Sequence, residues 1–529
     1  MDYHPGPRLM QAFQSPRAAL IALCGFLGIL LILKPAQTPP LWFDEGWVVS
    51  LARNWVELGH YGHLQAGEAV PSTILNTGFP AVVPVALSFR LFGVGLWQAR
   101  LPGILFTLGA FGALYYLAGR LYGRSVAIGT LVVGLLLQFQ PDLHPILVGR
   151  QVLGEMPALF YLLSGFALLL WAWHRPRNAI PLAILFWALS LRTKPQILPF
   201  FFAALSLPLA LALWKRQWRT VRLLATALLG TLAAVALLAW FEQLFLNSLL
   251  VSPASGGDPY SMVGDPEVLR TYVFTLAPSA RLTAFLIAVL FGMPVLLGLL
   301  YAAWGFFRDR RDMDLASARE VGRLGLWAFA VSWLLWYLLF SIGFARYVFP
   351  ALFVGYIFAA ALLVGVAGDS TLLGFLKQGA AAIKARRDTR PRVSILLGAV
   401  LVPVVCLLTL LVLYNAYTTY SDDSVLKVAQ FFNTSTEPDA LIETYDSEIF
   451  FLLDRSYHYP PDSLQHQLNR RAVLGENPVI DYDPLSADPD YLVVGSFSRN
   501  WRLYEPVLAT GAFRLVRRFD QYEVYERSR

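Results

Sequence analysis

The chain has 529 residues, of which 57% are hydrophobic and only 15% are charged, and its formal net charge is +7. Soluble globular proteins carry about 25% charged residues, so this composition excludes an ordinary soluble protein. The mean hydropathy of +0.54 and the repeated apolar runs of about 17 to 25 residues instead indicate a polytopic, all-α membrane protein.

The apolar runs predict about 11 transmembrane helices in chain order. A further apolar stretch at 79–95 contains Arg90 with several prolines and glycines, so we expect an interfacial or re-entrant helix there. Lys34-Pro35-Ala36 is a poor signal-peptide cleavage site, so the first helix is expected to be retained. The predicted spans are 17–33, 100–119, 125–140, 156–173, 179–191, 195–214, 223–246, 282–304, 324–343, 347–366 and 393–413.

The distribution of Lys and Arg predicts the orientation. With the N-terminus in the cytoplasm, the inside segments hold 21 of the 42 basic residues, the outside loops hold 10, and the segment after residue 416 holds 11. Basic residues collect in cytoplasmic loops, so we expect a multi-pass plasma-membrane protein with an extracytoplasmic C-terminal region. The positive charge then faces anionic lipid, and we expect no nucleic-acid partner.

The sequence after residue 416 has the composition of a small extracytoplasmic α/β domain. Ser424–Phe432 predicts a short helix, and Ala440–Tyr445, Tyr491–Ser496 and Phe513–Tyr525 predict strands by their β-branched and aromatic content. We therefore divide the chain into a transmembrane domain (1–416) and this domain (417–529). The cysteines, Cys24 and Cys406, both lie in apolar spans, so we expect small buried side chains and no disulfide.

The first outside loop, 34–99, is too long for a simple connection and is expected to be functional. It begins with Trp42-Phe43-Asp44-Glu45-Gly46-Trp47, a pair of carboxylates between aromatic residues. Asp44 has two interpretations: the N-cap of a helix over 47–58, or a general base at the membrane surface that takes a proton from a sugar hydroxyl.

A second acidic site follows in Gly149-Arg150-Gln151-Val152-Leu153-Gly154-Glu155. Glu155 begins a span, where ionisable residues are expensive and usually functional. The alternative is a carboxylate that interacts favourably with a helix N-terminus. Asp142 and His144 lie nearby and are not candidates.

Cations are rare in the outside loops. Arg192-Thr193-Lys194 and Arg346-Tyr347 interrupt apolar runs at the outer side. Together these cations suit an anionic lipid phosphate, because Arg offers a bidentate fork and Lys a point charge. The alternatives are contacts with ordinary headgroups or ion pairs with Glu155.

These motifs, in this order and on this topology, resemble the GT-C glycosyltransferases, in particular the branch with the protein O-mannosyltransferases and the lipid A aminoarabinose transferase. The resemblance covers about residues 1–365. It is carried by Phe43-Asp44-Glu45, Gly59-His60-Tyr61-Gly62, Pro80 with Pro84, Phe92-Gly93, Ala99-Arg100-Leu101-Pro102, Arg150 to Glu155, Thr193-Lys194 and Ala345-Arg346-Tyr347-Val348-Phe349-Pro350.

The resemblance implies a polyprenyl-phosphate-linked sugar donor, inversion at the anomeric carbon, and an acceptor that is a glycan, a lipid or a protein. By position Asp44 matches the catalytic aspartate, and we expect Glu45 and Glu155 to assist it. Lys-Pro-Pro-Leu, frequent in this branch, is replaced here by Asn76-Thr77-Gly78-Phe79-Pro80. We expect no metal and no cofactor, with the donor phosphate bound by Lys194, Arg346, Arg192 and Arg150.

A polytopic secondary transporter or a flippase for lipid-linked sugars is the alternative function. Transporters usually contain internal repeats and interrupted helices at the membrane midplane. The ionisable residues of this sequence instead lie at the outer ends of its spans, which favours the enzyme.

Overall fold

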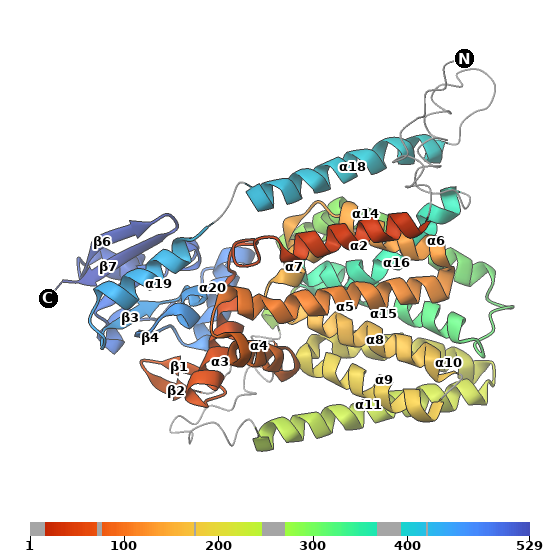
Figure 1. The fold of residues 1–529 in the computed structure, drawn as a ribbon, viewed down its shortest axis with the longest axis horizontal. Coiled ribbons are helices and arrows are strands. Elements are labelled where there is room, and N and C mark those ends of the chain that lie inside the picture. Colours follow the sequence, from red (N-terminus) through yellow and green to blue (C-terminus); the bar gives the residue numbers. More distant parts are fainter. Residues whose placement is uncertain are drawn as a thin grey trace, which may run out of the picture.

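The computed structural model describes residues 16–70, 77–173, 176–245, 270–367, 393–418 and 422–528. Figure 1 shows a bundle of long helices that carries a smaller region of strands and short helices at one end. The bundle contains α2 (Pro16–Ile32), α5 (Leu96–Tyr122), α6 (Arg124–Leu136), α7 (Pro145–Arg150), α8 (Glu155–Ala172), α9 (Pro176–Thr193), α10 (Leu198–Trp214), α11 (Trp218–Phe245), α14 (Pro278–Arg308), α15 (Ala318–Phe340), α16 (Phe349–Ala367) and α18 (Val393–Thr418).

Eight helical segments of the described residues are long and apolar enough to cross a membrane. They correspond to the predicted spans at 100–119, 156–173, 195–214, 223–246, 282–304, 324–343, 347–366 and 393–413; the last lies in α18, whose apolar, membrane-length part is Leu401–Thr418. The three remaining predictions, 17–33, 125–140 and 179–191, correspond to α2, α6 and α9, which are helices with shorter apolar stretches. The protein is therefore a multi-pass membrane protein with a mostly helical fold, as predicted.

The packing of α14 shows how this apolar sequence forms a bundle. Ala280, Ala284, Ala288 and Gly292 recur at intervals of four residues on its buried face. Small residues at this spacing let two helix backbones approach closely within a membrane. A Cβ atom on Gly298 would lie 2.4 Å from the backbone nitrogen of Ala359 on α16. Many large side chains of α14 instead point outward, among them Leu290, Leu300 and Trp304.

The segment between α2 and α5 lies at the end of the bundle that faces the C-terminal region (Figure 1). It contains the helix α3 (Phe43–Leu58), a short hairpin of β1 (His63–Gln65) and β2 (Glu68–Val70), and α4 (Phe79–Phe92). With 14 residues, α4 is about 21 Å long and too short to cross the hydrocarbon core. It packs against α3, α5 and α9.

The C-terminal region, residues 422–528, contains a five-stranded mixed sheet in the order β4-β3-β5-β7-β6. The first three strands of that order are parallel, and β7 and β6 continue it as an antiparallel hairpin. Its elements are α19 (Ser424–Ser435), β3 (Leu441–Thr444), the 3₁₀ helix η5 (Ser447–Leu452), β4 (Ser456–His458), α20 (Asp462–Leu474), η6 (Pro484–Ala487), β5 (Tyr491–Val494), α21 (Ser496–Asn500), α22 (Glu505–Ala509), β6 (Phe513–Phe519) and β7 (Tyr522–Arg527).

Two sequence predictions about this region and the cysteines are wrong in detail. The strand predicted over Phe513–Tyr525 is a hairpin, whose turn places Asp520 at φ 46°. Asp tolerates this conformation, so the turn has no glycine to reveal it. Cys24 is exposed and Cys406 is half-buried, because α2 and α18 lie at the edge of the bundle, where an apolar side chain can face lipid.

Candidate active site

The first acidic residue of the site lies in the first turn of α3. The helix begins at Phe43 after the extended residue Trp42, four residues earlier than predicted, so Asp44 is inside the helix and is not its N-cap. The Asp44 side chain is 43% exposed and forms an ion pair with the guanidinium of Arg346. Asp44 is therefore accessible from solvent and is held by a cation from a distant segment.

Arg346 lies between two carboxylates. It belongs to the 3₁₀ helix η4 (Ala345–Val348), which leads directly into α16. Besides its ion pair with Asp44, its Nε atom is 3.5 Å from the Glu155 carboxylate, and its guanidinium lies 5.8 Å from the centre of the Trp42 ring. This arginine therefore connects α3 to the start of α8.

Glu155 and Lys194 form the second half of the site. Glu155 begins α8, and the Lys194 ammonium donates a hydrogen bond of 2.9 Å to its Oε1 atom. The other carboxylate oxygen of Glu155 is buried and has no hydrogen-bond partner among the described residues. We call Asp44, Glu155, Lys194 and Arg346 the site cluster; its formal charges sum to zero.

Gly154 gives the Lys194 side chain room to reach Glu155. A Cβ atom at position 154 would lie 2.8 Å from Lys194 Cε and 2.9 Å from its Cγ. Thr77 approaches the same point at 3.1 Å. The glycine in the Leu153-Gly154-Glu155 motif therefore has a direct steric role beside the site cluster.

Further polar residues near the site cluster were not among the predicted site residues. The Tyr272 hydroxyl accepts a 2.5 Å hydrogen bond from Asn469 of α20, in the C-terminal region. Burial raises the pKa of Tyr272 to about 12, and the charge of Asp44 acts in the same direction, so this hydroxyl remains a proton donor at neutral pH. Burial also raises the pKa of Asp142, while Arg346 opposes the shift. Tyr347 follows Arg346, and its backbone carbonyl accepts a 2.7 Å hydrogen bond from the indole of Trp333.

Glu45 lies in a different environment from Asp44 although the two residues are adjacent. Its carboxylate is fully buried and accepts two 2.8 Å hydrogen bonds from Arg100, which is also fully buried. The backbone amides of Val152 and Trp42 donate to the same carboxylate at 3.0 and 3.3 Å. Arg100 in turn donates to the carbonyls of Pro35 and Pro39. This network joins the start of α3 to α5 and to the segment before α8.

The other two predicted cations lie outside the site cluster. Arg150 is buried and donates to the Tyr417 hydroxyl at 2.6 Å and to the carbonyls of Leu30 and Leu33. It thereby connects α7 with α2 and α18. Arg192 forms an ion pair with Glu242 of α11. Thus the structure brings together Asp44, Glu155, Lys194 and Arg346, and separates Glu45, Arg150 and Arg192 from them.

The described residues contain no group of three or more His, Cys, Asp or Glu side chains that could hold a metal ion.

Comparison with known proteins adds independent observations. The family model described as dolichyl-phosphate-mannose-protein mannosyltransferase matches residues 82–240. This segment contains Glu155 and Lys194 but not Asp44 or Arg346. No curated protein sequence matches the chain significantly.

Solved structures resemble nearly the whole chain. The crystal structure of ArnT from Cupriavidus metallidurans bound to undecaprenyl phosphate is 15% identical, with a TM-score of 0.61 over 96% of this chain and 97% of that one. The archaeal oligosaccharyltransferase AglB from Archaeoglobus fulgidus, in complex with an inhibitory peptide and a dolichol-phosphate, is 12% identical, with a TM-score of 0.53 over 97% of this chain and 74% of that one.

The family model and the solved structures agree on the fold of this chain. The resemblance to the GT-C glycosyltransferases, and to the branch with the protein mannosyltransferases and ArnT, is confirmed: this chain has the GT-C fold.

Proposed function

We propose that this protein transfers a sugar, with inversion, from a polyprenyl-phosphate donor to an acceptor hydroxyl at the extracytoplasmic face of the plasma membrane. The observation that carries the proposal is the ion-pair cluster of Asp44 with Arg346 and of Glu155 with Lys194 and Arg346. Four residues from distant segments meet at one end of a membrane bundle, and two of them are cations suited to a phosphate.

The donor is inferred from chemistry and from relatives. The ArnT structure contains undecaprenyl phosphate and the AglB structure a dolichol-phosphate. A lipid phosphate at the membrane surface would meet Lys194, at the turn before α10, and Arg346, at the turn before α16. The acceptor is a hydroxyl of a glycan, a lipid or a protein.

In the proposed reaction Asp44 is the general base. It takes the proton from the acceptor hydroxyl, whose oxygen attacks the anomeric carbon opposite the phosphate. A new C–O bond forms to the acceptor, and the bond between the sugar and the phosphate oxygen breaks through an oxocarbenium-like transition state, as in glycoside hydrolysis. The phosphate leaves with the bonding electron pair and needs no proton from the protein.

The two cations favour the transition state over the bound donor. A polyprenyl-phosphate sugar carries one negative charge at its phosphodiester, and the released lipid phosphate carries up to about two. Lys194 and Arg346 would therefore interact more strongly with the developing phosphate than with the donor, and only such differential stabilisation accelerates a reaction. Glu155 would hold both cations in place through its shared carboxylate.

We infer positioning roles for the remaining predicted residues. Glu45 is fully buried against Arg100 and would fix the start of α3. Arg150 would fix α7 against α2 and α18. Arg192, paired with Glu242, would hold α9 against α11.

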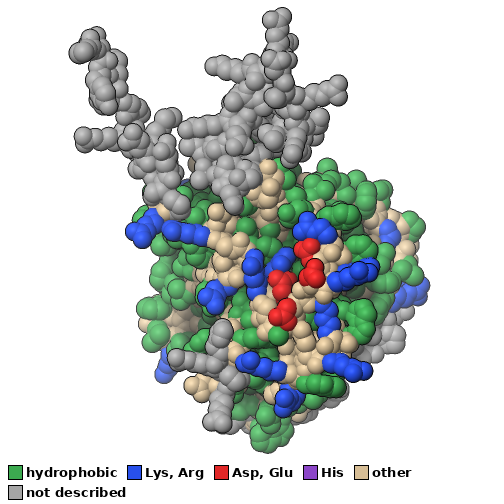
Figure 2. Space-filling model, turned by 90° about the vertical axis from the view of Figure 1, so that its right-hand side faces the viewer, with side chains coloured by type: hydrophobic (Ala, Val, Ile, Leu, Met, Phe, Trp, Pro, Cys, Tyr) green, Lys and Arg blue, Asp and Glu red, His purple; other side chains and the backbone are tan. Residues whose placement is uncertain are grey.

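The charge distribution supports the proposed orientation. Figure 2 shows the end of the bundle opposite the C-terminal region, where Lys and Arg side chains are spread over the surface with a few Asp and Glu side chains among them. Basic residues of the helix turns at this end include Arg120, Arg124, Lys215, Arg310 and Arg311. Because basic turns face the cytoplasm, the site cluster and the C-terminal region would face outward.

A donor-turnover assay tests the reaction class. The purified protein in lipid nanodiscs would be given a panel of polyprenyl-phosphate sugars with candidate acceptors, and release of free lipid phosphate would be followed. We expect release from one donor only when an acceptor is present. Movement of a lipid-linked sugar across sealed vesicles without release of lipid phosphate would instead establish a flippase and contradict the proposal.

A further inference from the structure

The helix that carries Asp44 receives part of its packing from the C-terminal region. Phe43 and Trp47 belong to the same buried hydrophobic cluster as Phe450, Tyr459 and Trp501 of that region. The next residues of α3, such as Val49 and Leu51, belong instead to a cluster with α4. One face of α3 is therefore part of the C-terminal core, and another face packs on the bundle side.

The first turn of α3 touches the backbone of η5. The Ser447 hydroxyl donates a 2.6 Å hydrogen bond to the carbonyl of Phe43, the residue before Asp44. A Cβ atom on Gly46 would lie 2.3 Å from the Ser447 carbonyl oxygen, so only glycine permits this approach. The start of the helix is thus fixed beside Asp44.

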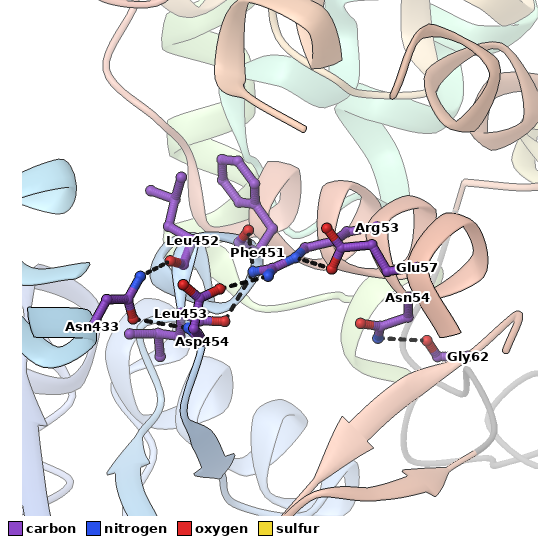
Figure 3. Close-up of polar contacts among 9 residues, drawn as sticks. All are labelled: Arg53, Asn54, Glu57, Gly62, Asn433, Phe451, Leu452, Leu453 and Asp454. Carbon is purple, nitrogen blue, oxygen red and sulfur yellow. Dashed lines mark hydrogen bonds and ion pairs between the residues drawn. The ribbon is translucent and has the colours of Figure 1, made fainter. Parts of the chain in front are cut away.

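The third turn of α3 is held by Arg53 (Figure 3). Its guanidinium donates to the carbonyls of Phe451 and Leu453 at 2.9 Å and to the Asp454 carboxylate at 2.7 Å. Its Nε atom donates to Glu57, one turn further along α3, at 2.7 Å. The Arg53 side chain is 17% exposed. One side chain of α3 therefore satisfies three acceptors of the C-terminal region.

The loop that accepts these hydrogen bonds, residues 451–454, is itself held by a residue of α19. The Asn433 side-chain amide donates to the Leu452 carbonyl at 2.9 Å, and its oxygen accepts from the Asp454 amide at 2.8 Å. Arg53 therefore contacts a fixed loop, and the orientation of α3 is coupled to the C-terminal fold.

We propose that Arg53 is a positioning residue through which the C-terminal region fixes the direction of α3, and so the place of the Asp44 carboxylate. This inference rests on the proposed function. Arg53 lies nine positions after Asp44, about 13.5 Å along the helix axis. Ser447 and Arg100 hold the start of α3, and Arg53 holds its third turn. Without the attachment at the third turn the direction of α3 is less fixed, and a tilt of about 4° moves the two ends by about 1 Å relative to each other. A displacement of that size can cost about 100-fold in rate.

The test compares Arg53→Gln with Arg455→Gln in the full-length protein in nanodiscs. Arg455 is an arginine of the same loop, but it donates to Asn433 and Thr436 within the C-terminal region, so its loss perturbs this region without breaking the contact with α3. We expect kcat to fall about 10- to 100-fold in Arg53→Gln and to stay near the wild-type value in Arg455→Gln. Stoichiometric binding of undecaprenyl phosphate, used as a probe, should be unchanged in both.

Either of two results would overturn the inference. One is a wild-type kcat in Arg53→Gln. The other is a loss of kcat in both variants that matches a loss of undecaprenyl phosphate binding sites, because this pattern reports unfolding alone.

Hydrogen exchange separates this inference from the proposed function. Amides of 43–58 should exchange faster in Arg53→Gln than in the wild type or in Arg455→Gln. If the wild-type protein turns over no donor, the proposed function fails, but this comparison still decides whether Arg53 couples the C-terminal region to α3. Unchanged exchange in Arg53→Gln would contradict the coupling.

Discussion

The carboxylate of Asp44 and the guanidinium of Arg346 form an ion pair although 302 positions separate them in the chain. One comes from the first turn of α3 and the other from the turn that begins α16. Arg346 also approaches Glu155, which accepts a hydrogen bond from Lys194. The proposed base and the proposed phosphate-binding cations are therefore parts of one network.

Loss of either cation should weaken use of the donor. Lys194→Gln and Arg346→Gln should each lower kcat/KM for the donor by about 10- to 100-fold, since hydrogen bonds to charged groups contribute about 1.5–3 kcal/mol. Steady-state kinetics with varied donor measures this effect. Arg192→Gln is the matched control, because Arg192 pairs with Glu242 outside the site cluster. A larger loss of kcat/KM in Arg192→Gln than in Lys194→Gln would contradict the assignment of Lys194 as a phosphate-binding residue.

Glu45 should matter for folding more than for chemistry. Glu45→Gln leaves Arg100 as a buried charge without its carboxylate, which should cost about 3–5 kcal/mol. A lower midpoint of thermal unfolding in detergent measures the loss. Asp309→Asn breaks a solvent-exposed pair with Arg308 and should leave the midpoint unchanged. A Glu45→Gln protein of wild-type stability that had lost all activity would indicate a catalytic role instead.

Gly154→Ala should alter the site without altering the fold. The added methyl group would lie within 3 Å of Lys194 Cε and Cγ, so the lysine side chain has to move from Glu155. We expect a higher KM for the donor and an unchanged unfolding midpoint. Gly112→Ala, in α5, is the control, since nothing lies within 4 Å of its Cβ position. Equal kinetics of both variants would contradict the steric role of Gly154.

The C-terminal region should lose stability as the pH rises. Burial, together with the charge of Asp446, raises the pKa of Glu448 from about 4.5 to about 8. The folded state then binds a proton that the unfolded state releases, so the stabilisation is complete below about pH 4.5 and declines up to about pH 8. Hydrogen exchange of 441–452 between pH 5 and 8 measures the trend, corrected for the intrinsic exchange rate. Glu448→Gln should remove most of this pH dependence. The same pH dependence in that variant would contradict the assignment of the effect to Glu448.

The helices could be predicted from the sequence because lipid demands long apolar runs. The same reasoning singled out Asp44, Glu155, Lys194 and Arg346. Placing an ionisable residue at the end of a membrane span costs free energy, and such residues are usually functional. The turn of the β6–β7 hairpin was missed because Asp520, not glycine, adopts the positive φ angle.

The assignment of neighbouring residues to different environments could not be predicted. Asp44 and Glu45 are adjacent, but successive side chains of a helix point about 100° apart. Because the predicted helix began at residue 47 rather than at Phe43, the helix geometry did not indicate which carboxylate faces the cations, and only the family resemblance pointed to Asp44. The partners of Arg150 and Arg192, which are Tyr417 and Glu242, are 267 and 50 positions away and carry no local signal.

The most direct test of the central claim is single-turnover transfer with Asp44→Asn. Asn keeps the size of the side chain but cannot remove the proton from the hydroxyl of the sugar acceptor. With the donor identified by the panel, the variant should bind undecaprenyl phosphate and unfold at the wild-type temperature, while the rate of sugar transfer falls at least 100-fold, as expected for loss of a general base. Transfer at the wild-type rate by the folded variant would contradict the role of Asp44 as the base.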